Sequence, residues 1–172
     1  EQAKNLAYGM KELEVQITGN LGDAYYQSGN YQKAWLSYDQ ALRMDPSNDY
    51  VLNNYAYFLS VEGENLEQAE KMSKQTVDRN PRSATYLDTY GWILFKMEKY
   101  SEAIIHFREG LKKVKGEGLK SDILYSIGLI HETEKEYDTA LEYFEKSYEG
   151  YSKVDDYGKM ALNLSKKGKY YD

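Results

Sequence analysis

The sequence contains no cysteine and only two prolines among its 172 residues. Without cysteine there is no disulfide, no thiol nucleophile and no thiolate metal ligand. The scarcity of proline leaves room for long helices, because a proline inside a helix removes a backbone donor. No apolar run approaches the roughly 20 residues that a membrane-spanning helix requires, so we expect no membrane span. The formal net charge of −6 argues against a nucleic-acid partner, which needs a concentrated basic surface.

What is present is an ordinary globular balance, with 41% hydrophobic and 29% charged residues. The length suits one domain or one repeat array. Tyrosine is unusually frequent, at 19 residues. Because the chain begins at Glu1, we expect a processed protein or a piece of a longer one. Both the cytoplasm and a bacterial envelope are compatible with this composition.

Small residues recur at a nearly constant spacing along the chain. One series lies 34, 35 and 37 residues apart, and a second lies 35, 34 and 37 apart. The first series is Gly22, Ala56, Gly91 and Gly128, and the second is Ala34, Ala69, Ala103 and Ala140. Self-similarity at this period indicates a repeated supersecondary unit.

Each unit has the pattern of two helices joined by a short turn. Apolar residues at i, i+3 and i+7, such as Leu52, Tyr55 and Leu59, indicate the first helix. The second helices are predicted to begin near Tyr31, Leu66, Tyr100 and Tyr137. Pro46 and Pro81 are predicted to end two of them, since proline disfavours helix in the residue before it.

These motifs resemble the tetratricopeptide repeat (TPR) family. Residues 15–48 match its signature at Leu21, Gly22, Tyr25, Ala34, Ala41 and Pro46. Residues 49–83 carry one extra residue in the turn and lack the family's glycine and aromatic residue. The resemblance implies an all-α fold, a right-handed superhelical solenoid of antiparallel helix pairs with about four repeats plus terminal helices. Parts of the chain are similar to bacterial TPR proteins, both envelope proteins and sensory regulators.

The resemblance also divides the chain. The expected segments are an N-terminal helical extension over 1–14, repeats over 15–48, 49–83, 84–120 and 121–153, and a terminal capping helix or truncated fifth repeat over 154–172. Residues 112–120 lengthen the third repeat, and this junction indicates either natural drift or an engineered join.

In TPR arrays the first helices line a concave groove, and the resemblance implies which residues face it here. The predicted groove residues are Tyr26, Tyr50, Asn53, Tyr57, Asp88, Trp92, Phe95, Tyr125 and Leu129. Aromatic rings and amides suit an extended peptide or a partner helix. Some TPR domains instead hold a C-terminal carboxylate with a clamp of basic residues and asparagine. Here only Asn54 matches that clamp, while Gly19, Asp23, Thr85 and Thr89 stand where basic residues or asparagine are needed.

The tyrosines divide between this groove and the packing positions of the repeat. The predicted packing tyrosines are Tyr25, Tyr31, Tyr38, Tyr55, Tyr90, Tyr100 and Tyr137. Of the two histidines, His131 falls on a core position and His106 on a second helix. Neither has the spacing of a zinc motif, so we expect no metal, no cofactor and no catalytic residue.

The expected function is a non-catalytic protein-interaction scaffold whose groove binds a peptide or a partner helix. One alternative is a peptide-sensing regulatory domain of a larger bacterial signalling protein. Another is a self-associating structural array. For the latter, the terminal helices would pair through two apolar faces, Leu6, Met10, Leu13 and Ile17 near the N-terminus and Tyr157, Met160, Ala161 and Leu164 near the C-terminus.

Overall fold

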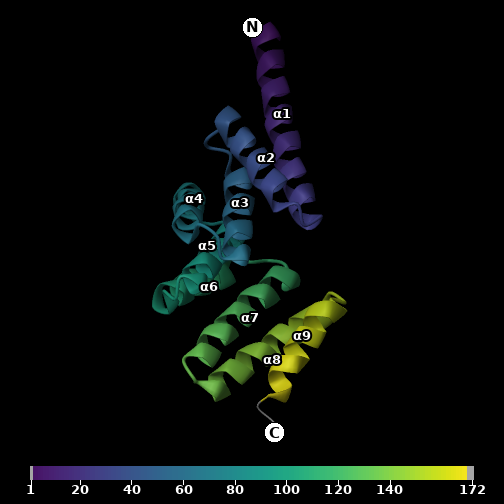
Figure 1. The fold of residues 1–172 in the computed structure, drawn as a ribbon. Coiled ribbons are helices and arrows are strands. Elements are labelled where there is room, and N and C mark those ends of the chain that lie inside the picture. The colour runs from purple at the N-terminus through teal and green to yellow at the C-terminus, as the bar shows by residue number, and fades with distance from the viewer. Residues whose placement is uncertain (1, 170–172) are drawn as a thin grey trace. The chain divides into compact units, whose positions relative to one another are not determined.

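The computed structural model describes the backbone of residues 2–169 and the side chains of residues 9–169. Within these residues the chain forms nine α-helices and no strand (Figure 1). The helices are α1 (Gln2–Gln27), α2 (Tyr31–Met44), α3 (Asp49–Glu62), α4 (Leu66–Arg79), α5 (Ala84–Lys96), α6 (Tyr100–Lys113), α7 (Glu117–Thr133), α8 (Tyr137–Lys153) and α9 (Tyr157–Gly168). The second helices begin at the four predicted residues, Tyr31, Leu66, Tyr100 and Tyr137. Helix α1 continues without a break from the predicted N-terminal extension into the predicted first repeat.

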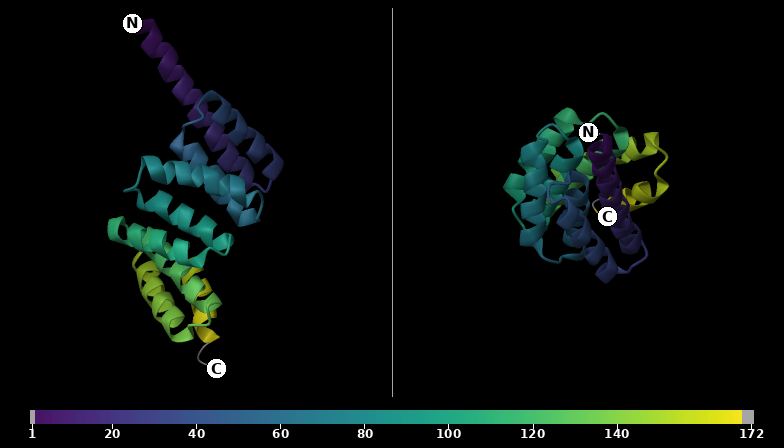
Figure 2. Two further views of the ribbon diagram at one scale, coloured as in Figure 1. Left: turned by 90° about the vertical axis from the view of Figure 1, so that its left-hand side faces the viewer. Right: turned by 90° about the horizontal axis from the view of Figure 1, so that it is seen from above.

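The chain divides into two compact units, Glu1–Thr76 and Val77–Asp172, with the boundary inside α4. In the first unit, α1 packs on α2 and on α3. In the second unit, α5 packs on α6 and α7 on α8, as Figures 1 and 2 show, and α9 packs on α8. None of the helices in the described part of the chain combines the length and apolar character that crossing a membrane requires.

Side-chain caps fix where several helices begin. The side-chain oxygen of Asn48 accepts from the backbone N–H of Val51 at 3.1 Å, and that of Ser83 accepts from Tyr86 at 3.3 Å. Each bond satisfies a backbone donor that the first helical turn leaves without a partner. The first helices α3 and α5 therefore start immediately after these capping residues.

The turns between paired helices share one geometry. Gly29, Glu98 and Lys135 have positive φ angles of 78°, 61° and 64°. The next residue's N–H reaches back five positions, as Asn30 does to Tyr25 at 2.8 Å. The residue with positive φ and the hydrogen bond to the carbonyl five residues earlier together end the first helix of each pair. The second helix then runs back along the first.

A glycine faces an aromatic ring in three of the helix pairs. A Cβ added at Gly22 would lie 2.6 Å from the ring of Tyr38, and one at Gly91 would lie 2.8 Å from the ring of Phe107. At Gly128 the Cβ would lie 2.6 Å from Phe144. All three rings are fully buried. The small residues thus recur because each ring lies directly on the partner helix's backbone.

Some predicted packing positions are wrong. Tyr38, Tyr55 and Tyr90 are buried and Tyr25 and Tyr100 are partly buried, whereas Tyr31, Tyr137 and the signature residue Leu21 are exposed. Tyr31 and Tyr137 each open a second helix, and Tyr31 lies at the surface beside the rings of Tyr26 and Trp35, with centroids 5.2 Å and 6.2 Å away.

The terminal helices leave their predicted apolar faces largely uncovered. Met10, Leu13 and Ile17 are 65%, 56% and 51% exposed on α1, where the side chain of Leu6 lies outside the described part. On α9, Tyr157, Ala161 and Leu164 are exposed and Met160 is partly buried. The residue that α9 buries is Asn163, whose Nδ2 donates to Ser147 at 3.1 Å.

Candidate functional site

The first unit brings four of the predicted groove residues to α1 and α3. Tyr50 and Tyr57 on α3 are 43% and 40% exposed, while Asn53 is buried. Tyr26 on α1 stacks on Phe58 with a ring separation of 3.9 Å, and its hydroxyl donates to Glu62 at 2.7 Å. This face therefore carries two exposed tyrosine rings, Tyr50 and Tyr57, beside the partly buried ring of Tyr26.

A single carboxylate organises the polar groups of this face. Asp23 on α1 accepts from the hydroxyl of Tyr38 at 2.5 Å, from the hydroxyl of Tyr50, and from Nδ2 of Asn54 at 3.2 Å. Burial and the neighbouring carboxylate raise the pKa of Tyr50 to about 12, so this hydroxyl stays a donor. With three donors around Asp23, its charge is satisfied within the unit.

In the second unit, α5 carries Asp88, Trp92 and Phe95, all partly buried. Trp92 and Phe95 lie with ring centroids 5.3 Å apart, and Nζ of Lys96 lies 5.9 Å from the Trp92 ring. The indole N–H of Trp92 is buried and has no hydrogen-bond partner. An unpaired buried donor costs about 1–3 kcal/mol, which is unusual for a residue whose only role is packing.

The next first helix, α7, contributes Tyr125 and Leu129, both partly buried, together with two acidic residues that pair with α9. Lys159 donates to Asp122 at 2.6 Å, and Lys166 donates to Glu132 at 2.6 Å. Asp122 also accepts from the hydroxyl of Tyr151 at 2.7 Å. The charges of Asp122 and Glu132 are therefore neutralised by lysines of α9.

Asp88 differs from these neighbours. Burial raises its pKa to about 7, the charge of Asp122 adds to that rise, and the charge of Lys159 opposes it. Unlike Asp23 and Asp122, Asp88 makes no hydrogen bond or ion pair with any described residue. It is a partly buried acidic group, and the lysine that acts on it, Lys159, is bound to Asp122.

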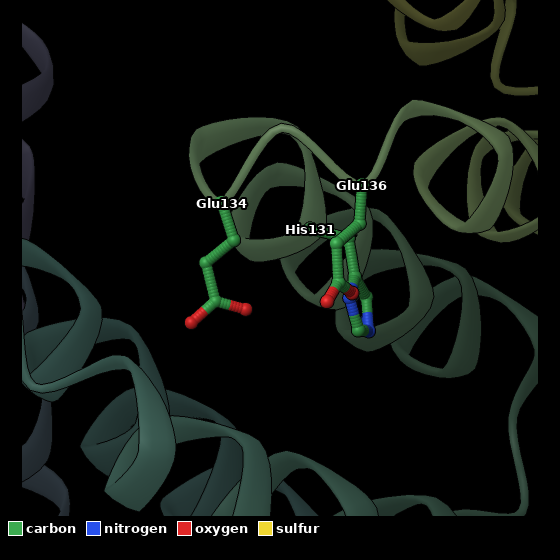
Figure 3. A group of neighbouring side chains, drawn as sticks. All are labelled: His131, Glu134 and Glu136. Atoms are coloured by element: carbon green, nitrogen blue, oxygen red, sulfur yellow. The ribbon is translucent and has the colours of Figure 1, made fainter.

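One group in the described part of the chain has a donor set that could hold a metal ion: His131, Glu134 and Glu136 (Figure 3). Their nearest ligand atoms lie within 4.8 Å of one another. The ring of His131 is buried, stacks on Tyr143 at 5.4 Å, and places Nδ1 2.7 Å from Oε2 of Glu136.

An ionised carboxylate only accepts hydrogen bonds, so Nδ1 of His131 carries the proton in this pair. In this tautomer the lone pair of the ring lies on Nε2, which is buried and has no hydrogen-bond partner in the described part of the chain. In the arrangement observed, the pair ties the end of α7 to the start of α8. The burial of His131 confirms its predicted place in the core.

Comparison with protein families decides the identity of the repeats. A family model described as TPR repeat matches residues 22–59, and one described as tetratricopeptide repeat matches residues 89–154. Together the two matches cover more than half of the chain. The chain belongs to the TPR family.

Among curated relatives, the type IV pilus assembly protein PilF of Pseudomonas aeruginosa is 29% identical to this TPR chain over 127 residues, which cover 74% of the chain and 50% of the relative. Mouse neutrophil cytosol factor 2 is 29% identical over 110 residues, covering 54% of the chain and 21% of the relative. The chain thus spans half or less of the length of these relatives.

Solved structures share the fold of this TPR chain. The Pseudomonas aeruginosa PilF structure superposes with a TM-score of 0.71 at 22% identity, covering 92% of this chain and 77% of that one. The type IV pilus biogenesis factor PilW superposes with a TM-score of 0.71 at 18% identity, covering 89% and 76%. MamA superposes with a TM-score of 0.65 at 22% identity, covering 90% and 83%. TPR repeat proteins are generally protein–protein interaction scaffolds.

The predicted site residues of this TPR chain omitted the groups that pair with α9. Lys159 and Lys166 are the partners of Asp122 and Glu132, and neither lysine is among the predicted groove residues. A signal was present, because lysines seven residues apart lie on one face of a helix. Lys146 and Lys153 on α8 have the same spacing and pair with Glu142 and Glu117, so the spacing by itself does not identify the lysines of α9.

Proposed function

We propose that this TPR chain is a non-catalytic scaffold that binds a peptide or a partner helix through the aromatic faces of its first helices. The observation that carries the proposal is the set of rings left partly at the surface of α3 and α5, namely Tyr50, Tyr57 and Trp92. Tyrosine and tryptophan are enriched at binding hot spots because they supply contact area at low entropic cost. The family's general role as an interaction scaffold supports this reading.

Each unit carries its own share of the proposed binding surface. In the first unit Tyr26, Tyr50, Asn53 and Tyr57 form it, and in the second Asp88, Trp92, Phe95, Tyr125 and Leu129 do. We also propose that the repeats span residues 15–48, 49–83, 84–120 and 121–153, with flanking helices over 1–14 and 154–172.

Two exposed tyrosines allow a matched test. Tyr57 on the first helix α3 and Tyr137 on the second helix α8 are 40% and 48% exposed. We expect Tyr57→Ala and Trp92→Ala each to weaken binding of peptides selected from a library by about tenfold or more. Tyr137→Ala should leave the affinity unchanged. Equal losses for Tyr57→Ala and Tyr137→Ala, measured by fluorescence anisotropy on folded variants, would contradict the proposal.

A second function is favoured by the uncovered face of α1. Met10, Leu13 and Ile17 form a continuous apolar stripe on one side of this helix, and a contiguous exposed apolar surface marks an interaction site. If copies of the chain associate through it, sedimentation equilibrium will show an oligomer that Ile17→Lys dissociates. A monomer over a hundredfold range of concentration would exclude this function and leave the first one standing.

A further inference from the structure

The carboxyl group of Asp88 lacks the hydrogen-bond donors that Asp23 and Asp122, two other acids of the first helices, have. Asp23 accepts from Tyr38, Tyr50 and Asn54, and Asp122 accepts from Tyr151 and Lys159. Asp88 is partly buried and has no such donor among the described residues. Burying a charge without a partner is costly, so a site of this kind gains stability from an added cation.

The charged groups that act on Asp88 come from two other helices of the second unit, Asp122 on α7 and Lys159 on α9. Lys159 is 2.6 Å from Asp122 and is therefore committed to that carboxylate. Asp122 repels the charge of Asp88, which raises the local demand for positive charge. The other two lysines of α9 are paired as well, Lys166 with Glu132 at 2.6 Å and Lys167 with Glu145 at 3.4 Å.

Aromatic surface flanks the unpaired carboxylate. Asp88 and Trp92 are four residues apart on α5, so their side chains share one face of that helix. Phe95 continues this face beside Trp92, with ring centroids 5.3 Å apart. A carboxylate next to an indole is the combination that a cation with an apolar stem prefers, since the charge meets the acid while the stem packs on the ring.

We propose that Asp88, flanked by Trp92, is the point at which the second unit binds a cationic side chain, lysine or arginine, of a peptide or helical partner. This inference rests on the proposed function and specifies the chemistry of its partner. A basic partner also complements the net charge of −6 carried by the chain. A partner presenting a carboxylate at this point would be repelled by Asp88 and Asp122 together.

The affinity of the proposed site for a cationic side chain should depend on pH. The cation binds the ionised form of Asp88, whose pKa is raised to about 7 in the free protein. Below that pKa the carboxyl group must lose a proton before it can pair. We therefore expect the affinity for a basic peptide to rise about tenfold between about pH 6 and pH 8, and to lose this dependence in Asp88→Asn.

The experiment selects binders from a displayed library of random peptides of about 12 residues. Wild-type protein, Asp88→Asn, Trp92→Ala and a control, Asp138→Asn, are used in parallel, Asp138 being an exposed acid at the start of α8. Wild type and the control should enrich peptides with lysine or arginine at a fixed position. Replacing that residue by norleucine in a synthetic peptide should weaken binding to wild type at least about tenfold and binding to Asp88→Asn much less.

The outcomes separate this inference from the function on which it rests. If wild type and Asp88→Asn select the same motif without a fixed basic residue, while Trp92→Ala loses binding, the cation site is wrong and the scaffold proposal stands. If wild type selects no peptide at all, both are wrong. Separate synthetic peptides with lysine and with arginine at the fixed position show which cation the site prefers. Circular dichroism melts confirm that each variant is folded.

Discussion

The two units fill the same packing position with different rings. In the first unit the ring that lies on a glycine is Tyr38, and its hydroxyl reaches Asp23 at 2.5 Å. In the second unit the corresponding rings are Phe107 and Phe144, which have no polar tip. The residues that follow the glycines match this difference: Asp23 follows Gly22, whereas Trp92 and Leu129 follow Gly91 and Gly128.

This comparison shows that the repeat requires a flat ring at this position but not a particular polarity. A hydroxyl carried into the core must find an acceptor, because an unpaired buried hydroxyl is costly. The first unit meets the requirement with a carboxylate on the neighbouring helix. The second unit has phenylalanine there and needs no acceptor. The position on α5 that corresponds to Asp23 is Trp92. The choice of ring in the core therefore decides which residue the first helix presents beside it.

The largest effect is expected from removing a ring in the second unit. Phe144 is fully buried, so Phe144→Ala should lower the free energy of unfolding by about 3–5 kcal/mol through lost burial and a cavity. Urea denaturation followed by circular dichroism measures the loss. Tyr137→Ala on the same helix removes an exposed ring and should change stability by less than about 0.5 kcal/mol. Similar losses for both variants would show that the buried ring has no special role.

The glycine opposite a ring should tolerate no methyl group. Gly91→Ala places a Cβ 2.8 Å from Cε1 of Phe107, and we expect a loss of about 1–3 kcal/mol from overpacking. Gly116→Ala is the control, because no atom lies within 4 Å of the added Cβ there. Thermal unfolding of both variants tests the prediction, and a neutral Gly91→Ala would mean that the two helices separate without cost.

Exchanging the ring polarity should harm both units for opposite reasons. Tyr38→Phe removes a hydrogen bond to a carboxylate, which costs about 1–2 kcal/mol. Phe107→Tyr introduces a buried hydroxyl into a helix pair where tryptophan, not aspartate, follows the glycine, and this costs a similar amount. If Phe107→Tyr combined with Trp92→Asp is more stable than the two single changes predict, as measured by a double-mutant cycle, the pairing rule holds in the second unit too.

The smallest effect is a pH dependence confined to the second unit. The pKa of Asp88 is raised from 3.8 to about 7 in the folded protein, so the folded state holds this proton more tightly than the unfolded state. The resulting stability is full below about pH 4 and is lost as the pH rises through 7. Because Asp88 is partly exposed, we expect a loss of only about 1 kcal/mol. Hydrogen exchange of α5 amides should show it in wild type and not in Asp88→Asn.

Much of the helix pattern was predictable because it depends on local chemistry. Tyr31, Leu66, Tyr100 and Tyr137 each open a second helix as predicted. The capping side chains Asn48 and Ser83 and the left-handed turn residues act within a few positions of the helix ends. The period of the small residues predicted a repeated unit, and the signature residues within it carried the resemblance to the TPR family.

The candidate site was less predictable, because its chemistry depends on residues distant in sequence. The position of Asp88 on a first helix follows from the repeat, but its lack of a counter-ion follows from Lys159 pairing with Asp122 instead. Likewise, the exposure of Tyr31 and the burial of Asn53 depend on which helices cover them. The predicted groove residues remain a proposal for the binding experiments to test.

The sequence by itself determined the repeat, the helix starts and the positions that require a small residue, because backbone geometry and close packing allow few residues there. Only the tertiary structure decided the electrostatics. It assigned Asp23 three donors, Asp122 a lysine and a tyrosine, and Asp88 none. The physical reason is distance: a charge is satisfied by groups within a few ångströms in space, and in this fold those groups lie tens of residues away along the chain.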